Sequence, residues 1–367
     1  MADKKLGFGL MRLPLTNPDK GSSIDIEQTK KMVDIFIEKG FTYFDTAWMY
    51  CGGKSEGAVK QVLTDRHPRE SFTVTSKLPS GSLTSFESRD EIFYEQLNRT
   101  GLQYFDYYLL HAVSTNTLVN FEKYDCFQWI KQKKSQGLVK NIGFSFHDGP
   151  ELLDKVLTEH PEFDVVQLQI NYLDWENPKV QSRACYEVAV KHGKKILIME
   201  PVKGGALANV PESVSNMFRY ADPKASVASW AVRFAAGLPG VFMVLSGMSN
   251  MEQVLDNTSY MVDFKPLNEE ETKMVHFAAE VISKQMTIAC TGCSYCLDPC
   301  PRKIAIPVYF KLFNRAENGE DLKEKYASLQ PKFGKASDCI VCGACEKICP
   351  QHLPIRKYLR SVAEKFE

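Results

Sequence analysis

The fold of the C-terminal part of the chain depends on a cysteine-rich stretch that occurs twice, as CTGCSYCLDPCP at residues 290–301 and as CIVCGACEKICP at residues 339–350. Each copy spaces four cysteines as C-x2-C-x2-C-x3-C and follows the last of them with a proline. The cysteines are Cys290, Cys293, Cys296 and Cys300 in the first copy, and Cys339, Cys342, Cys345 and Cys349 in the second. Closely spaced thiols that repeat in this way predict two metal centres.

This spacing resembles the cysteine run of bacterial-type ferredoxins, which hold two [4Fe–4S] clusters. The resemblance implies that three cysteines of one copy bind one cluster, and that the fourth cysteine reaches across to the other cluster. One predicted ligand set is therefore Cys290, Cys293, Cys296 and Cys349. The other is Cys339, Cys342, Cys345 and Cys300.

Zinc and disulfides are the alternatives for these cysteines. Zinc sites usually combine paired C-x2–4-C knuckles with four ligands for each ion, and two triplets with a trailing Cys-Pro fit that pattern less well. Disulfides need an oxidising compartment, and nothing in the sequence indicates export. The remaining cysteines, Cys51, Cys126 and Cys185, are expected to be small buried hydrophobic residues.

Composition limits the partners and the compartment. The 367 residues suffice for about two domains, and Lys plus Arg equals Asp plus Glu at 45 each. A balanced charge gives no field that attracts nucleic acid or an anionic membrane. The N-terminal stretch MADKKLGFGLMRLP has no signal-peptide core, and no apolar run reaches the roughly 18 residues of a membrane span. We expect a cytoplasmic protein without nucleic-acid or membrane partners.

From residue 1 to about residue 260, short apolar runs alternate with stretches of helical periodicity. The predicted strands are Gly7–Arg12, Phe41–Asp45, Phe72–Lys77, Tyr107–His111, Asn141–Ser145, Val165–Ile170, Ile196–Met199 and Val241–Ser246. Helices are expected near residues 27–39, 55–66, 87–100, 120–136, 150–159, 179–192, 224–236 and 250–258. Eight strand–helix units over about 250 residues favour an α/β fold of the (β/α)8 TIM-barrel type. A doubly wound open sheet is the alternative, but no G-x-G-x-x-G follows an early strand.

The barrel is expected to occupy residues 1–262, followed by a bridging helix within 263–287. The segment 288–367 is then a small iron–sulfur domain. Its middle, roughly 307–330, has helix-forming residues, so a mostly α-helical ferredoxin-like domain is predicted rather than a β-hairpin. So small a domain has little core, and cluster assembly is expected to contribute to its folding.

Ionisable side chains follow the predicted strands. Asp45 ends the second strand, Tyr50 stands five residues further on, Lys77 ends the third strand and His111 ends the fourth. Chemistry in a TIM barrel takes place at the carboxyl ends of the strands. Reduction of a carbonyl by hydride needs a proton for the developing alkoxide, and a tyrosine hydroxyl can donate it. A lysine ammonium held by an aspartate is expected to lower the tyrosine pKa, and a histidine can orient the carbonyl oxygen.

These residues resemble the aldo-keto reductases. The family signature FDTA-x-x-YG is matched by residues 44–50, with Cys51 before Gly52 where the family usually has Gly directly, and Lys77 and His111 match in TSKL and LLHA. The resemblance covers about residues 5–260. It implies Tyr50 as the general acid and base, Asp45 and Lys77 as its tuners, and His111 as the substrate-orienting residue. The whole chain resembles the branch of this family that carries a ferredoxin-type domain.

The same resemblance implies a nicotinamide cofactor across the barrel mouth. The implied positions are Gly9, Met11, Arg12, Ser145, Gln167, Lys203, Gly204, Gly247, Ser249, Gln253 and Asn257. His147 stands where an asparagine is common, and Met199 or Glu200 stands where an aromatic residue often stacks on the nicotinamide. Gly247 and Gln253 stand where NADPH-specific members carry basic residues. A phosphate typically demands Arg or Lys, so NADH is favoured over NADPH.

Four functions are compatible with these patterns. The first is a carbonyl or alcohol oxidoreductase that uses NAD(P)H, with the clusters relaying electrons. Hydride carries two electrons and a cluster one, so a flavin or a second protein would normally intervene; no flavin motif is evident. The second is a nicotinamide-independent reductase fed by a partner ferredoxin or flavoprotein. In the third and fourth, the barrel is a scaffold for an electron-transfer module, or the clusters are structural.

Overall fold

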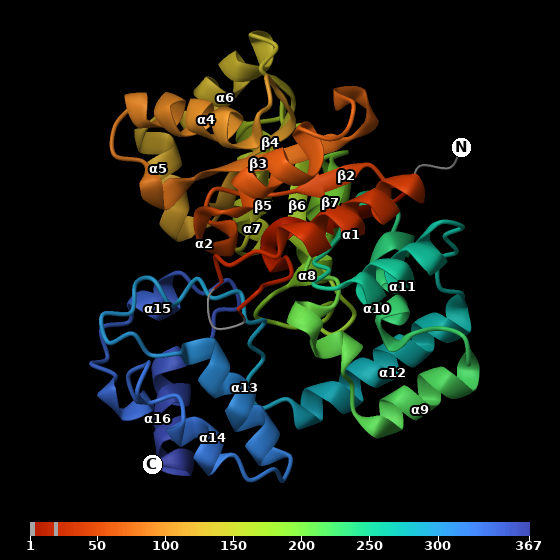
Figure 1. Ribbon diagram of the computed structural model, residues 1–367, viewed down its shortest axis with the longest axis vertical. Coiled ribbons are helices and arrows are strands. Elements are labelled where there is room, and N and C mark those ends of the chain that lie inside the picture. The colour runs from red at the N-terminus through yellow and green to blue at the C-terminus, as the bar shows by residue number, and fades with distance from the viewer. Residues whose placement is uncertain (1–3, 18–20) are drawn as a thin grey trace.

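The computed structural model describes residues 4–17 and 21–367, and its first large unit is a closed eight-stranded parallel barrel with strand order β1 to β8 (Figure 1). Residues 1–3, which begin the stretch predicted not to be a signal peptide, and residues 18–20 lie outside the described residues. The strands are β1 (Leu6–Gly9), β2 (Tyr43–Asp45), β3 (Thr73–Pro79), β4 (Phe105–Val113), β5 (Val139–Phe146), β6 (Val165–Gln169), β7 (Lys195–Met199) and β8 (Val241–Ser246).

All eight predicted strands are present, and closure of β1 onto β8 excludes the open sheet. Several predicted boundaries differ from the structure by one or two residues, and β3 and β4 continue two residues past Lys77 and His111. The largest difference is in the first strand. The first strand ends at Gly9, and Leu10–Arg12 forms a 3-10 turn, η1, instead of continuing the strand. The turn carries Arg12 over the barrel mouth, where it reaches the C-terminal domain.

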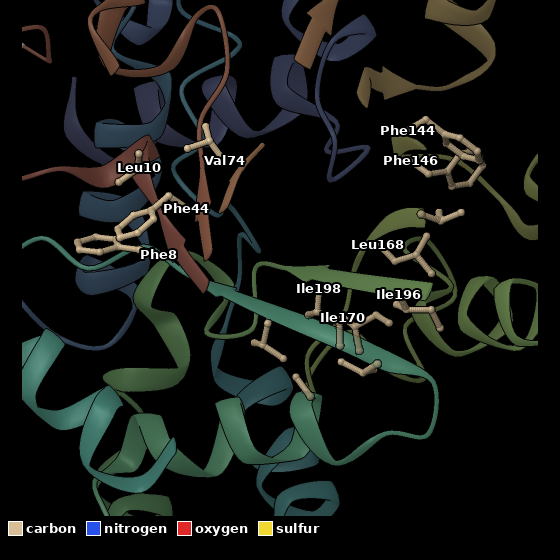
Figure 2. Close-up of a cluster of buried hydrophobic side chains, with 14 of the residues drawn as sticks. Phe8, Leu10, Phe44, Val74, Phe144, Phe146, Leu168, Ile170, Ile196 and Ile198 are labelled. Carbon is tan, nitrogen blue, oxygen red and sulfur yellow. The ribbon is translucent and has the colours of Figure 1, made fainter. Parts of the chain in front are cut away.

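Side chains alternate between the inside of the barrel and the layer under the helices. Tyr43, Leu109, Val165, Leu197 and Leu245 belong to one buried cluster inside the barrel. Neighbouring positions point outward into the larger core beneath the helices, as Figure 2 shows for labelled residues of β1, β2, β5, β6 and β7. Because successive strand residues face opposite sides, a residue two positions after an inward one also faces inward. This period directs Asp45 and His111 into the barrel mouth.

The helices around the barrel are α1 (Ile26–Glu38), α2 (Tyr50–Gly53), α3 (Ser55–Val59), α4 (Glu87–Thr100), α5 (Thr115–Lys123), α6 (Cys126–Ser135), α7 (Pro150–Glu159), α8 (Ser182–Lys191), α9 (Glu212–Ala221), α10 (Val227–Gly237), α11 (Met251–Met261) and α12 (Glu269–Gln285). A π-helical turn, η2 (Lys60–Thr64), extends α3. The helix predicted over 120–136 is two helices, α5 and α6, and α9 was not predicted.

The predicted bridging helix is α12. It begins with a capping box between Asn268 and Glu271, which satisfies backbone N–H groups at its first turn. Its buried face places Val275, Ala278 and Ile282 in the barrel's core cluster. The helix therefore packs as part of the barrel as well as leading out of it.

The C-terminal domain is helical, as expected. It consists of α13 (Ile306–Glu317), α14 (Lys323–Ala327), α15 (Ala344–Lys347) and α16 (Ile355–Phe366), with loops that carry the cysteines (Figure 1, blue). It has a small core of its own, which includes Tyr309, Phe310 and Leu359 and also Cys296 and Cys345. Within residues 4–17 and 21–367, no helix has the length and apolar character needed to cross a bilayer.

Candidate functional site

The four ionisable residues predicted at the strand ends come together at the barrel mouth. The Nζ of Lys77 donates to Asp45 Oδ1 at 2.6 Å and to the Thr46 carbonyl at 2.9 Å, and it lies 3.4 Å from the Tyr50 hydroxyl. The rings of Tyr50 and His111 meet edge to face, with centroids 5.9 Å apart. All these side chains line one cavity. The arrangement presents a hydroxyl and an imidazole to the same point, backed by a buried ion pair.

Local backbone geometry delivers Tyr50 to this point. Tyr50 begins α2, and the next residue, Cys51, has φ of 52°, in the left-handed region that costs a side chain about 1–2 kcal/mol. Gly52, with φ of 60°, follows. This tight turn after β2 brings the Tyr50 hydroxyl over Lys77, and it explains why a glycine is the usual residue after the tyrosine in the resembled signature.

Burial sets the protonation of the site. Burial raises the pKa of Asp45 and lowers the pKa of Lys77, while their mutual attraction opposes both shifts. Burial, followed by the positive charge of Lys77, lowers the pKa of His111 well below 6.5. His111 is therefore a neutral imidazole at neutral pH, able to share a hydrogen bond without carrying charge.

The prediction that Lys77 lowers the pKa of Tyr50 is wrong for this structure. Burial raises the pKa of Tyr50 well above 10, and nearby Tyr295, Asp45 and Glu200 act in the same direction. The charge of Lys77 is balanced by Asp45 at 2.6 Å, so the pair offers little net stabilisation to a phenolate. Tyr50 thus remains a protonated hydroxyl, which suits it to donate a proton.

The cavity that holds this tetrad has a volume of about 350 Å³ and runs toward the start of α11. Ten of the eleven predicted cofactor positions line it: Gly9, Met11, Arg12, Ser145, Gln167, Gly204, Gly247, Ser249, Gln253 and Asn257. Within the described part of the chain, the Oε1 of Gln167 is buried without a hydrogen-bond partner. An unsatisfied acceptor inside a cavity costs free energy that a ligand N–H can recover.

Lys203 differs from its expected position. Its buried Nζ forms an ion pair with Asp174 Oδ1 at 2.5 Å and lies 3.2 Å from Gln351 Oε1. It lines a neighbouring cavity instead of the one that holds the tetrad. Because its charge is already compensated, Lys203 is not free to hold an anionic ligand here.

One acidic residue at the far end of the cavity was not predicted from the sequence. Asp256 lies on α11, three residues after Gln253, and lines the cavity beside it. Its Oδ2 accepts a hydrogen bond from Ser226 at 2.7 Å. Helical spacing could have revealed it, because positions three residues apart share a helix face.

Three residues that the C-terminal domain contributes to the barrel mouth were also not predicted from the sequence. The Thr291 carbonyl accepts from Arg12 at 2.9 Å and presses on Gly204, where a Cβ atom would lie 2.0 Å from it. The Tyr295 hydroxyl is 3.3 Å from His111 Nε2. Gln351 Nε2 donates to Gln169 Oε1 at 2.6 Å. Each follows a predicted cluster cysteine by one or two positions, so one set of cysteine loops forms the roof of the site.

The cysteines gather in two groups. Cys300 shares a small cavity with Cys339, Cys342 and Cys345. Cys349 lies close enough to Cys290, Cys293 and Cys296 to influence the pKa of all three thiols electrostatically. Backbone N–H groups point at the sulfurs: Gly292 N donates to Cys290 Sγ at 3.4 Å, and Cys349 accepts from residues 351–353.

Donors aimed at thiols suit iron–sulfur ligands, because hydrogen bonds to the sulfurs help to set cluster potentials. Among the residues that the structure describes, no group of three or more His, Cys, Asp or Glu side chains is arranged to hold a metal ion. The cysteine groups are included in this finding, so their role as cluster ligands stays a prediction.

The partly buried His147 gives the site a pH-dependent stability. Burial, followed by the nearby His352, lowers the pKa of His147 to about 4, and its Nδ1 has no hydrogen-bond partner among the described residues. As the pH falls, His147 takes up a proton in the unfolded chain before it does so in the folded protein. Its contribution to the free energy of unfolding is therefore fully present above about pH 6.5 and is lost as the pH drops toward 4. We expect the protonation of His147 to lower the free energy of unfolding by about 1 kcal/mol between about pH 7.5 and about pH 5.5.

The measurement is the thermal unfolding midpoint across that pH range for the wild type and for His147→Asn. The variant should show the shallower decline with falling pH. His192→Asn is the matched control, because His192 is partly exposed and paired with Asp154 at the surface. Identical pH profiles for the wild type and His147→Asn would contradict the expectation.

Comparison with known proteins agrees with this geometry. The model of the aldo/keto reductase family matches residues 5–280, and that of a 4Fe-4S dicluster domain matches residues 289–354. An aldo-keto reductase of Mycobacterium avium (strain 104) is 28% identical over 265 residues, 71% of this chain and 86% of the relative.

Two solved structures share the barrel. Aldo-keto reductase AKR11C1 from Bacillus halodurans (holo form) has a TM-score of 0.60 at 21% identity, covering 75% of this chain and 91% of that chain. An aldo/keto reductase from Klebsiella pneumoniae, solved with NADP and acetate, has a TM-score of 0.59 at 18% identity, covering 74% and 89%. With the tetrad, the closed barrel and the family match over three quarters of its length, this chain belongs to the aldo/keto reductase family and carries a 4Fe-4S dicluster domain at its C-terminal end.

Proposed function

We propose that this protein reduces an aldehyde or ketone, or oxidises the corresponding alcohol, with a nicotinamide cofactor, and that its clusters relay electrons. The observation that carries the proposal is the shared cavity. Asp45, Tyr50, Lys77 and His111 line the same 350 Å³ space as ten predicted cofactor positions. A proton donor and a cofactor groove that open onto one point are the two parts that carbonyl reduction by hydride requires.

The chain's own residues divide the work. A bound nicotinamide would supply the hydride to the carbonyl carbon. Tyr50, protonated because burial raises its pKa, donates the proton to the carbonyl oxygen. His111, neutral because burial lowers its pKa, fixes the position of that oxygen through Nε2. Lys77 and Asp45 hold the Tyr50 hydroxyl in place, since the Lys77 Nζ lies 3.4 Å from it.

Two polar side chains support a nicotinamide at this point. A carboxamide offers an N–H donor and a carbonyl acceptor. The unpartnered Oε1 of Gln167, within the described residues, can accept from the amide N–H. The Ser145 hydroxyl already accepts from Ala112 N at 2.7 Å, so its own proton remains to donate to the amide oxygen. Both line the cavity beside the tetrad.

We expect NADH to bind at least about tenfold more tightly than NADPH. The solved Klebsiella pneumoniae relative holds NADP, but the adenosine end of this cavity carries Gln253 and Asp256. A carboxylate there can accept from a ribose hydroxyl and repels a 2′-phosphate. Dissociation constants for both cofactors, measured by fluorescence titration, test the preference. Asp256→Asn should reduce the difference in affinity between NADH and NADPH. Equal or tighter NADPH binding by the wild type would refute the preference for NADH.

For the clusters, we propose the crossed ligand sets: Cys290, Cys293, Cys296 and Cys349 for an inner cluster, and Cys339, Cys342, Cys345 and Cys300 for an outer one. The grouping of Cys300 with the second triplet and of Cys349 with the first supports them. The first set lies nearer the barrel, because Cys293 lines the main cavity. The second set lies nearer solvent, because Cys342 is exposed. Electrons from a partner ferredoxin or flavoprotein would therefore enter at the outer cluster.

A second function is favoured by the roof of the site, in which electrons reach the barrel through the clusters without a nicotinamide. Thr291, Tyr295 and Gln351 connect the inner cysteine loops directly to the barrel mouth. The two functions differ in what NADH does. In an anaerobic titration of reconstituted protein, a cluster EPR signal that appears with NADH alone would connect the nicotinamide to the clusters. A signal that only dithionite produces would favour an external one-electron donor.

A further inference from the structure

A second cavity lies between the barrel rim and the C-terminal domain, with a volume of about 150 Å³. Its barrel side is formed by residues at or just after the carboxyl ends of β2, β3, β4 and β5. Its other side is formed mainly by the loop that ends at Cys349 and Pro350. Apolar groups dominate the lining, among them Met49, Pro79, Ala112, Ile348 and Pro350. The cavity therefore exists only because the two domains meet.

His111 and Tyr295 separate this second cavity from the groove that holds the cofactor candidates, since both residues line both spaces. The Tyr295 hydroxyl lies 3.3 Å from His111 Nε2 and within hydrogen-bonding reach of the Tyr50 hydroxyl. Those are the two groups that a carbonyl oxygen must contact. Tyr295 thus stands between the apolar cavity and the point of reaction.

The backbone before Tyr295 is held in an unusual conformation. Gly292 and Ser294 both have φ of 67°. For Ser294 this is the left-handed region, which costs a residue with a side chain roughly 1–3 kcal/mol and often marks a functional loop. The Tyr295 N–H also donates to the Cys293 sulfur. The backbone conformations of Gly292 and Ser294 and the contact with Cys293 thus orient the Tyr295 phenol toward the barrel.

We propose that the 150 Å³ cavity binds the substrate, that Tyr295 is its gate and size filter, and that the substrate is a small, uncharged, largely apolar aldehyde or ketone. This inference rests on the proposed carbonyl chemistry of Tyr50. A cavity of about this volume holds a benzene-sized molecule. When a carbonyl oxygen reaches Tyr50 and His111, it takes the hydrogen bonds that the Tyr295 hydroxyl now shares.

Charge at the cavity supports an uncharged substrate. Asp148 is already satisfied by the Thr115 backbone N–H at 2.7 Å and hydroxyl at 2.8 Å. Lys347 lines the cavity but is exposed, so its ammonium remains hydrated. The interior offers hydrogen bonds at His111, Tyr295 and His147, and apolar side chains form much of the remaining lining.

Substrate size tests the assignment. Full-length reconstituted protein is assayed anaerobically with acetaldehyde, isobutyraldehyde, benzaldehyde and glyoxylate. Tyr295→Ala should raise the ratio of kcat/KM for benzaldehyde over acetaldehyde by about tenfold or more, because hydrophobic pockets discriminate by about that factor per methylene. Gly81→Leu should lower the ratio, since Gly81 lines the cavity and a Cβ there meets nothing within 4 Å. Gly57→Leu on α3, with equally open space, is the control.

Tyr295→Phe separates the gate from a structural role. It keeps the ring but removes the hydroxyl that competes for Tyr50 and His111, so the KM for aldehydes should fall several-fold while the size ratio stays unchanged. Iron content confirms that each variant is loaded. Because Tyr295 follows Cys293 by two positions, benzaldehyde should also perturb the EPR signal of dithionite-reduced wild type, and less so that of Gly81→Leu.

The outcomes are distinct. If the wild type reduces aldehydes but neither Tyr295→Ala nor Gly81→Leu changes the size ratio, the cavity assignment is wrong and the proposed function stands. A preference for glyoxylate would overturn the uncharged substrate class. If the wild type reduces no aldehyde, the proposed function fails. In that case, unchanged EPR with benzaldehyde overturns the cavity assignment as well, whereas a shift lost in Gly81→Leu retains it as a binding site.

Discussion

Tyr50→Phe is expected to lower kcat for NADH-dependent aldehyde reduction by roughly 10²–10⁴-fold, the range that a positioned general acid contributes. The phenol is the donor closest to the reaction point, buried at 9% exposure and 3.4 Å from Lys77 Nζ. Phenylalanine preserves the ring and its packing against His111, so the dissociation constant for NADH should change little. Steady-state kinetics and a cofactor titration on the same preparation measure both quantities.

The control for this substitution is Tyr186→Phe. Tyr186 donates its hydroxyl to the Pro239 carbonyl at 2.8 Å, at the end of the barrel opposite the mouth, so removing that hydroxyl should leave kcat near the wild-type value. A Tyr50→Phe variant that retains more than about a tenth of the wild-type rate would show that another group supplies the proton, with Tyr295 the nearest alternative.

The direction of the pKa shift at Tyr50 bears on which reaction is faster. A hydroxyl whose pKa is raised well above 10 holds its proton at all moderate pH values. Such a group serves reduction, which begins with a protonated tyrosine, better than oxidation, which begins with the phenolate. The reductive rate is therefore expected to stay level from neutral pH upward until other groups titrate, while the oxidative rate should climb with pH.

The barrel could be predicted from the sequence because each of its strands and helices is indicated by a pattern within a short stretch of residues. The carboxyl ends of parallel strands meet at one end of a barrel, so Asp45, Lys77 and His111 could be assigned to that end without knowing any distance. The wrong strand end at Leu10–Arg12 also comes from a local pattern, which in this case was misleading. The residues Gly9-Leu10-Met11-Arg12 keep an apolar pattern suited to a strand, but the chain turns as soon as Gly9 has paired with Asp45.

The contacts between the domains could not be predicted, because no local pattern specifies how two folded units dock. Tyr295 and His111 are 184 positions apart, and Gln351 and Gln169 are 182 apart. Lys203 shows the consequence. The family resemblance implied a cofactor contact for Lys203, but only the folded chain brings Asp174 and Gln351 to its ammonium. Likewise, the burial that raises the pKa of Tyr50 depends on a domain lying over the barrel mouth.

The crossed ligand sets make a second prediction of large effect, which double variants can test. If Cys349 serves the cluster of the first triplet, Cys293→Ala and Cys349→Ala damage the same cluster, and the double variant should retain about four irons per chain. Cys342→Ala combined with Cys349→Ala damages both clusters and should retain almost none. Uncrossed ligation predicts the opposite for each pair. Iron analysis after anaerobic reconstitution, with EPR of the dithionite-reduced protein, measures the outcome.

The same logic applies to Cys300, and the structure makes the contrast sharp. Cys300 lies in one small cavity with Cys339, Cys342 and Cys345, and Pro301 lines that cavity too. Cys300→Ala with Cys342→Ala should therefore leave the inner cluster intact, together with its contacts through Tyr295 to the barrel. The proposed inner cluster would lie beside the active site, because Cys293 lines the main cavity. This variant should therefore keep NADH-dependent aldehyde reduction while losing electron entry from an external donor. If the double variant loses aldehyde reduction as well as electron entry, the barrel's activity depends on Cys300 and Cys342. The contacts of the first cysteine loops with the barrel would then not be sufficient for it.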